Sequence, residues 1–180
     1  MTDKKALVPV QHEVVSIVQN QIKITEKIIT SLVRKTCENN KYGISCLTDI
    51  RKAAEQGDVN AQCRLGQMYR LGEGVPLDDV EAAKWFCKAA EQGDLYAQGI
   101  MGWLYRCGEG VPQDDAEAGN WYRKAADQGL ADAQFWLGVM YRCGQGGVQK
   151  DDVEAAKWFR KAAEQGNKDA QLKLDEMKDK

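Results

Sequence analysis

The chain has 180 residues, of which 43% are hydrophobic and 29% are charged, so its composition is that of a folded globular protein. Its 25 Lys and Arg nearly balance 27 Asp and Glu, and the resulting net charge of -2 argues against an extended polyanion such as nucleic acid as the partner. The single histidine, His12, argues against a His-based metal site and against Ser-His or Cys-His catalysis, and therefore against most enzyme classes.

Residues 1–45 are predicted to form a helical segment separate from the rest of the chain. Apolar residues recur along it at helical spacing, so we expect one amphipathic helix over about residues 10–37. Seven Lys/Arg and four Asp/Glu give the segment a net charge of +3. The favoured interpretation is a cap over the structure that follows. A dimerising element and a tethered recognition arm are alternatives, and binding to an anionic membrane surface is the least favoured one.

Nothing in the sequence indicates export or a membrane span. No run of 18 apolar residues occurs, and charged residues interrupt the first 25 positions, where a signal peptide needs an apolar stretch. The six cysteines have no repeated spacing, which favours reduced thiols in a reducing compartment over disulfides or a zinc site. We therefore expect a cytoplasmic protein.

The rest of the chain is an internal repeat. The signature Ala-Ala-(Glu/Asp)-Gln-Gly returns with spacings of 36, 36 and 37 residues, at 53–57, 89–93, 125–129 and 162–166. Each unit between these marks carries two helical stretches, which in the first unit cover residues 61–69 and 78–92. The extra residue of the third unit falls in the glycine-rich loop between its helices, where an insertion is tolerated.

The helix boundaries have recognisable signals. Asp78 and Glu81 match an Asp-x-x-Glu capping box at the start of the second helix, in which the Asp carboxylate accepts from helix amides and the Glu side chain accepts from the Asp amide in return. The same pair recurs in the next two units. The glycine of the signature ends each second helix. We predict a domain at 46–180 of three helix-turn-helix repeats, at about 58–93, 94–129 and 130–166. Half-repeats are expected at both ends, with polar residues at Asp49 and Asp175 facing water.

The repeated motif is A-Q-x-x-L-G-x-M-Y-x-x-G-x-G-V, followed by D-x-x-E-A-x-x-W-[FY]-x-K-A-A-x-Q-G. It resembles the Sel-1-like repeat, a relative of the tetratricopeptide repeat. The resemblance implies an all-α fold, a right-handed α/α superhelix whose first helices line a concave face. It also implies a role as an adaptor or scaffold in protein-protein interaction, and a bacterial source is expected. Some secreted relatives have been linked to β-lactam binding or hydrolysis, but the S-x-x-K nucleophile motif of that chemistry is absent here.

Helical-wheel positions separate an expected core from an expected binding surface. The aromatic pairs of the second helices, such as Trp85-Phe86, are predicted to be core, and Gly66, Gly102 and Gly138 are predicted to allow close helix packing. The opposite side of the first helices is not required by the core. Its candidate partner-binding residues are Arg70, Tyr96, Trp103, Arg106, Phe135, Val139 and Arg142.

Within this set, Trp103 and Phe135 are expected to be apolar anchors, and the three arginines are expected to meet carboxylates of an acidic protein or peptide partner. The arginines have a second interpretation, as helix formers whose charge suits a helix C-terminus. The binding surface also has a second interpretation, in which residues 10–37 or a second copy of the chain cover it and no other partner binds. The wheel leaves the orientation of Ile100 and Trp136 open.

No catalytic constellation is found in the sequence. There is no nucleophile paired with a base, no metal cluster and no phosphate loop, because the Gly-Glu-Gly-Val turns lack the Lys-Ser/Thr of a P-loop. We therefore expect a non-enzymatic protein without a cofactor or metal.

Overall fold

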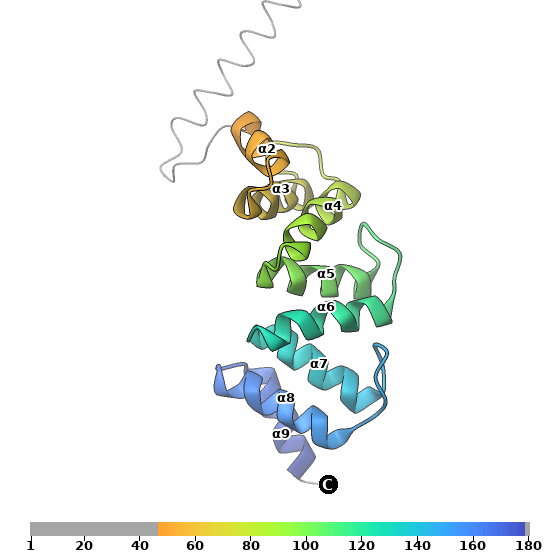
Figure 1. Cartoon of the computed structure of the whole chain (residues 1–180). Coiled ribbons are helices and arrows are strands. Elements are labelled where there is room, and N and C mark those ends of the chain that lie inside the picture. Colours follow the sequence, from red (N-terminus) through yellow and green to blue (C-terminus); the bar gives the residue numbers. More distant parts are fainter. Residues whose placement is uncertain (1–46, 179–180) are drawn as a thin grey trace, which may run out of the picture. The chain divides into compact units, whose positions relative to one another are not determined.

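The computed structural model describes residues 47–178, which contain the repeat region (Figure 1). The predicted segment 1–45, with the helix expected over residues 10–37, lies outside the described residues.

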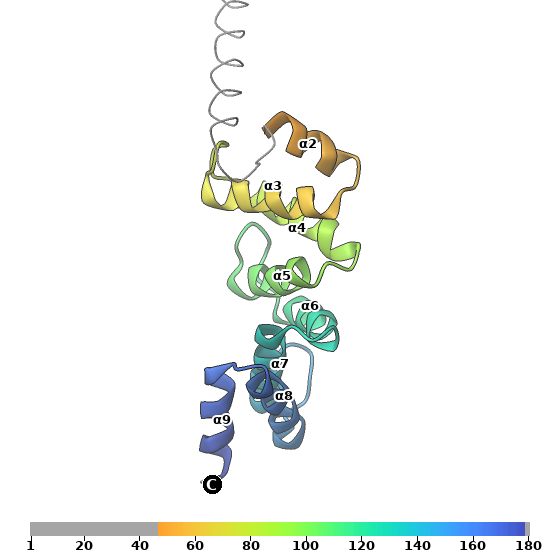
Figure 2. The ribbon, with the colours of Figure 1, turned by 90° about the vertical axis from the view of Figure 1, so that its left-hand side faces the viewer.

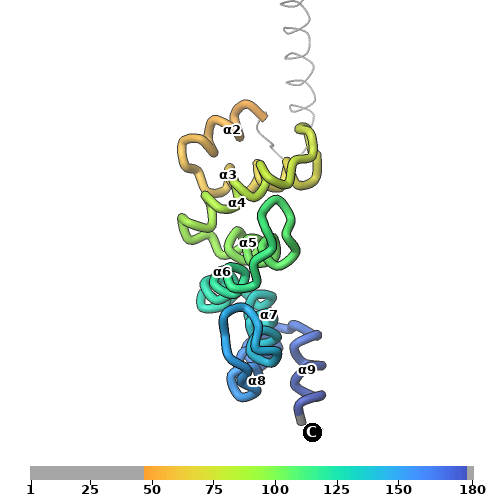
Figure 3. The backbone as a smooth tube through the Cα atoms, turned by 90° about the vertical axis from the view of Figure 1, so that its right-hand side faces the viewer, coloured from red at the N-terminus to blue at the C-terminus, as the bar shows by residue number. Residues whose placement is uncertain are grey.

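The described part of the chain consists of helices and contains no strand. The helices are α2 (Leu47–Glu55), α3 (Val59–Leu71), α4 (Asp79–Glu91), α5 (Leu95–Cys107), α6 (Asp115–Asp127), α7 (Ala131–Cys143), α8 (Asp152–Glu164) and α9 (Lys168–Lys178). From α3 onward each helix packs against the next one in the chain, as Figures 2 and 3 show from two sides. The predicted all-α solenoid is confirmed, and α3-α4, α5-α6 and α7-α8 are its hairpins.

The second helices begin at the predicted capping residues, but only half of the predicted capping box forms. The Asp78 carboxylate accepts a hydrogen bond from the Glu81 amide at 3.0 Å, and Asp114 and Asp151 do the same in the next two units. The amide of Asp78 does not bind Glu81 in return. It donates to the backbone carbonyl of Tyr69 at 2.9 Å, because the loop brings the end of α3 beside the start of α4. The reciprocal half of the prediction is therefore wrong.

Glycine allows the two helices of each hairpin to pack closely. A Cβ atom placed on Gly66, Gly102 or Gly138 would lie 3.0, 2.6 or 2.8 Å from a ring carbon of the following helix. The rings belong to Phe86, Tyr122 and Phe159. The predicted close packing is confirmed, and it explains why these helices tolerate a residue that disfavours helix. In α9 the equivalent position is Asp175, and no described helix follows to place a ring there.

Buried glutamines join three consecutive helices in every unit. Gln98 on α5 is 5% exposed, and its side-chain amide donates to the Ala90 carbonyl in α4 at 3.1 Å. Its side-chain oxygen accepts from Gln128, the residue that follows α6, at 2.8 Å. The same pair of bonds is made by Gln62 and by Gln134 in the neighbouring units. The glutamines of both repeated motifs thus satisfy each other and a helix-end carbonyl inside the core.

Candidate functional site

The seven candidate residues occupy corresponding positions along α3, α5 and α7, and we call the surface they define the first-helix face. They line separate pockets. Arg70, Tyr96 and Trp103 line one pocket, Arg106 and Val139 line a second, and Arg142 lines a third. Phe135 lines none of these three pockets.

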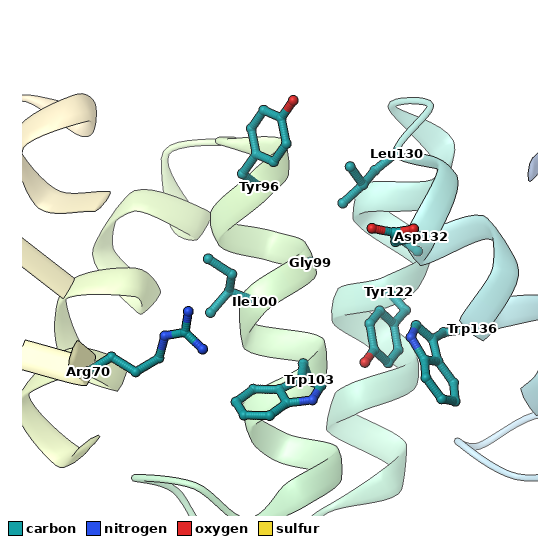
Figure 4. Close-up of a pocket in the computed structure, with 10 residues that line it drawn as sticks. Arg70, Tyr96, Gly99, Ile100, Trp103, Tyr122, Leu130, Asp132 and Trp136 are labelled. Atoms are coloured by element: carbon teal, nitrogen blue, oxygen red, sulfur yellow. The ribbon is translucent and has the colours of Figure 1, made fainter. Parts of the chain in front are cut away.

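The first of these, which we call the central pocket, lies between α5 and α7 and has a volume of about 310 Å³ (Figure 4). Its lining is mainly apolar and aromatic, with one cation and one carboxylate. The lining residues are Arg70, Tyr96, Gly99, Ile100, Trp103, Tyr122, Leu130, Asp132, Ala133 and Trp136. A concave apolar site with a few polar groups is the usual form of a ligand site.

Each arginine of the first-helix face reaches toward the first helix of the next repeat. The guanidinium carbon of Arg70 lies 5.9 Å from the ring centroid of Trp103, and that of Arg106 lies 3.9 Å from the ring of Trp136. Arg142 instead forms an ion pair with Glu176 at 3.3 Å. Glu176 occupies in α9 the repeat position that Trp103 occupies in α5.

The charges of the three arginines are therefore satisfied differently. Within residues 47–178, no carboxylate forms an ion pair with Arg70 or Arg106, and the buried Nε atoms of both are without a hydrogen-bond partner. Stacking on tryptophan stabilises a guanidinium but leaves its N–H groups available. Arg70 and Arg106 thus have N–H groups on the first-helix face that are available for hydrogen bonds with a partner.

Tyr122 comes from α6 and closes the central pocket from behind. It is 2% exposed, and its buried hydroxyl makes no hydrogen bond with the described residues. Burial raises the pKa of Tyr122 to about 12, although the donor groups and the positive charge of the nearby Arg106 guanidinium act in the opposite direction. The hydroxyl therefore stays protonated near neutral pH and is a donor without an acceptor.

Phe135 and Val139 are placed differently from the other candidates. Both are half-buried and pack against the apolar cluster of the last hairpin, which includes Phe159. The Phe135 ring lies 5.8 Å from the ring of Phe159 and 5.3 Å, edge to face, from that of Trp136. A wheel drawn for one helix places Phe135 outside the core because it does not include the helices that follow, α8 and α9, whose apolar residues cover it.

Sequence reasoning missed several residues of the central pocket. Trp136 and Ile100, whose orientation the wheel left open, both line it, as do Tyr122 and Leu130. The sequence does contain one indication that Leu130 is unusual, which is the absence of a capping side chain at this position. Asp58, Asp94 and Asn167 cap their helices with a side-chain oxygen, and Leu130, at the same repeat position, cannot.

Comparison with known proteins agrees with this architecture. The family model of the Sel1 repeat matches residues 50–58, 59–94, 95–130 and 131–167. The chain belongs to the Sel1 repeat family. Members of this family are generally scaffolds for protein-protein interaction. No match was found among curated proteins.

Three solved structures of bacterial proteins are similar to this Sel1 repeat chain. A Sel1 repeat protein from Oxalobacter formigenes is 42% identical over 72% of this chain and 97% of its own, with a TM-score of 0.67. The protein c5321, a protective antigen present in uropathogenic Escherichia coli strains and displaying an SLR fold, is 37% identical with a TM-score of 0.70. That match covers 83% of this chain but 34% of the Escherichia coli chain. Helicobacter pylori cysteine rich protein B (hcpB) is 28% identical over 73% of this chain and 99% of its own, with a TM-score of 0.55.

The Cys63 thiol is not activated for chemistry. Burial raises its pKa to about 12, together with the charge of Asp94 and a 3.5 Å hydrogen bond that the thiol donates to the Asp94 carboxylate, so this thiol is a poor nucleophile near neutral pH. In the part of the chain that the structure describes, no helix has the length and apolarity needed to cross a bilayer.

Proposed function

We propose that the protein is a non-catalytic interaction scaffold whose first-helix face, the concave face of the solenoid, binds a partner protein or peptide. The observation that carries the proposal is the central pocket. It joins an aromatic lining to an arginine that has no carboxylate partner among the described residues. Aromatic residues and arginine dominate the energetics of protein interfaces, and membership of the Sel1 repeat family supports the same role.

The partner is proposed to be acidic. Arg70, Arg106 and Arg142 occupy one repeat position, and where a carboxylate is within reach, at Glu176, the arginine pairs with it. An acidic segment lying along the first-helix face would offer the same contact to Arg70 and Arg106. The nearly balanced charge of the chain, -2, argues against nucleic acid as the partner.

A bacterial source and a cytoplasmic location are part of the proposal. The three bacterial relatives support the source. The thiols of Cys63, Cys87, Cys107 and Cys143 are free, which is compatible with a reducing compartment. Fractionation of the native cell tests the location, and recovery of the chain outside the cytoplasm would contradict it.

Site-specific photo-cross-linking tests the binding face directly. Tyr96 on α5 and Val153 on α8 are both 67% exposed, so a photoreactive phenylalanine analogue at either position reaches solvent equally. In the native cell, the probe at position 96 is expected to capture one protein, in an adduct that excess untagged chain competes away. The probe at position 153 is the control.

Equal labelling from positions 96 and 153 would contradict binding on the first-helix face. An adduct with the mass of two chains, or a cross-link from position 96 to residues 10–37, would instead support the self-filled alternative. A partner that is neutral or basic over the cross-linked segment would contradict the acidic assignment.

A further inference from the structure

The copies of the repeat can be compared with each other, and three of the differences that disfavour stability lie at the central pocket. At the N-cap position, Leu130 replaces the capping residues Asp58, Asp94 and Asn167, and α7 has no side-chain cap. Inside α5, Gly99 stands where the other first helices have Cys63, Phe135 and Leu172.

A third difference lies on α6. Tyr122 occupies the position of Phe86 and Phe159, and its additional hydroxyl is buried without a partner. A buried donor without an acceptor disfavours folding compared with the phenylalanine of the other repeats. Each of the three changes is therefore unfavourable for the isolated fold.

The three positions meet in space. A Cβ atom on Gly99 would lie 2.6 Å from a methyl carbon of Leu130, so glycine makes the room that the leucine side chain occupies. Leu130, Gly99 and Tyr122 all line the central pocket. Unfavourable choices that converge on one pocket are expected where function, not stability, determines the residue.

The lining also indicates the ligand chemistry. Trp103, Trp136 and Leu130 surround the pocket with apolar surface, and aromatic rings pack well on such walls. Arg70 lies on the opposite side of the pocket from Asp132 (Figure 4). Asp132 already accepts a hydrogen bond from Asn167 at 3.1 Å, whereas Arg70 has no described carboxylate partner. The pocket thus offers an aromatic site with a free cation at one edge.

We propose that the central pocket holds one aromatic side chain of the partner, with a neighbouring carboxylate of the partner paired to Arg70. This proposal rests on the proposed function and names the feature that the face recognises. The Tyr122 hydroxyl donates to a polar group of the same segment. The Tyr122 hydroxyl is buried and points toward the half-buried Trp103 side chain in Figure 4, so we expect Trp103 to turn aside when the partner binds.

Indole N–H signals of the full-length protein, labelled with ¹⁵N, provide the test. The probe is the acetylated tripeptide amide Asp-Phe-Asp, with Asp-Ala-Asp and Asn-Phe-Asn as controls. The signals of Trp103 and Trp136 are expected to shift saturably with Asp-Phe-Asp, while those of Trp85 and Trp121, both 8% exposed, stay in place. The alanine probe should not bind, and the asparagine probe should bind more weakly and with less dependence on salt.

Two variants separate binding from folding. Gly99→Ala pushes Leu130 into the pocket, and Tyr122→Phe removes the orphan donor. Both variants are expected to keep or raise the melting temperature. Both should weaken binding of the Asp-Phe-Asp probe about tenfold or more, which is the free-energy equivalent of one hydrogen bond. Tyr105→Phe, a tyrosine on α5 outside the pocket lining, is the matched control and should bind like the wild type.

Two results would overturn the inference: no shift of Trp103 or Trp136 at probe concentrations up to about 10 mM, the weak end of measurable affinity, or unchanged binding by both variants. Its failure is distinguishable from failure of the proposed function. A partner captured at position 96 that binds both variants normally would leave the face assignment standing and refute the pocket.

Discussion

The residues inside the solenoid are alike from repeat to repeat, whereas those of the first-helix face, apart from the arginines at 70, 106 and 142, differ. Inside, every unit repeats the same contacts, such as the ring over Gly102 and the bonds of Gln98, with nearly the same distances. On the first-helix face, the position of Trp103 is glutamine, tryptophan, valine and glutamate in successive helices. A stack of hairpins needs the first set of residues to be alike, and it leaves the second set free to vary. The difference therefore separates residues kept for folding from residues available for recognition.

The largest expected effect is on the interior. Gln98→Ala removes the buried side chain that donates to the Ala90 carbonyl and accepts from Gln128, while Gln128 keeps its bond to the Gly93 carbonyl, so unfolding should become easier by about 2 kcal/mol. Gln171, the equivalent residue in α9, is exposed, and its side-chain amide donates to Asp175 in its own helix. Gln171→Ala is the control and should change stability by about 0.5 kcal/mol or less. Urea unfolding of both variants measures the contrast, and equal losses would mean that the buried glutamine network is not stabilising.

A smaller loss is expected from Gly102→Ala. The added methyl group would lie 2.6 Å from the Tyr122 ring, and overpacking should outweigh the gain in helix propensity by about 2 kcal/mol. Gly99→Ala, one turn earlier in α5, meets only the flexible tip of Leu130 and should not destabilise. Thermal unfolding compares the two. If both glycines tolerate alanine equally well, the close approach of the hairpin helices is not what holds glycine at position 102.

The third expected effect is a loss of stability at high pH, caused by the Tyr122 hydroxyl, which lies between the interior and the first-helix face. The folded-state pKa of Tyr122 is about 12, compared with an ordinary value of 10.0. Between these values the unfolded chain loses this proton while the folded chain keeps it, so stability falls as pH rises. At pH 11 this proton should account for about 1 kcal/mol of the loss, and Tyr122→Phe should remove that part while the part due to Cys63 remains in both proteins. Unfolding curves at pH 9 and 11 measure the difference, and parallel losses in wild type and variant would contradict the buried state of the hydroxyl.

These contrasts also show what could be predicted from the sequence. The helix ends followed from local signals, because Asp78 caps α4 and the signature glycines have φ angles between 88° and 98°. The packing of Gly66, Gly102 and Gly138 followed from their recurrence. Local signals carry such features because each one is decided within one hairpin.

The site was less predictable because several helices build it. Arg70, Tyr96 and Trp103 were identified and do line the central pocket, but its back wall comes from Tyr122 on α6, which the aromatic-pair pattern assigned to the core. Phe135 was placed on the open surface, although residues of α8 and α9 partly cover it. The glutamine network was not foreseen either, because neither of its two motifs reveals the other as its partner.

The most direct test of the central claim, that the central pocket is shaped for recognition at the expense of stability, is Leu130→Asp. This change restores the N-cap of the sister helices and removes an apolar wall from the pocket. The free energy of unfolding and the affinity for the Asp-Phe-Asp probe are measured on the same sample. We predict a gain of about 1 kcal/mol in stability together with a loss of binding of about tenfold or more. A variant that is stabilised but binds as well as the wild type would contradict the claim, as would one that is destabilised.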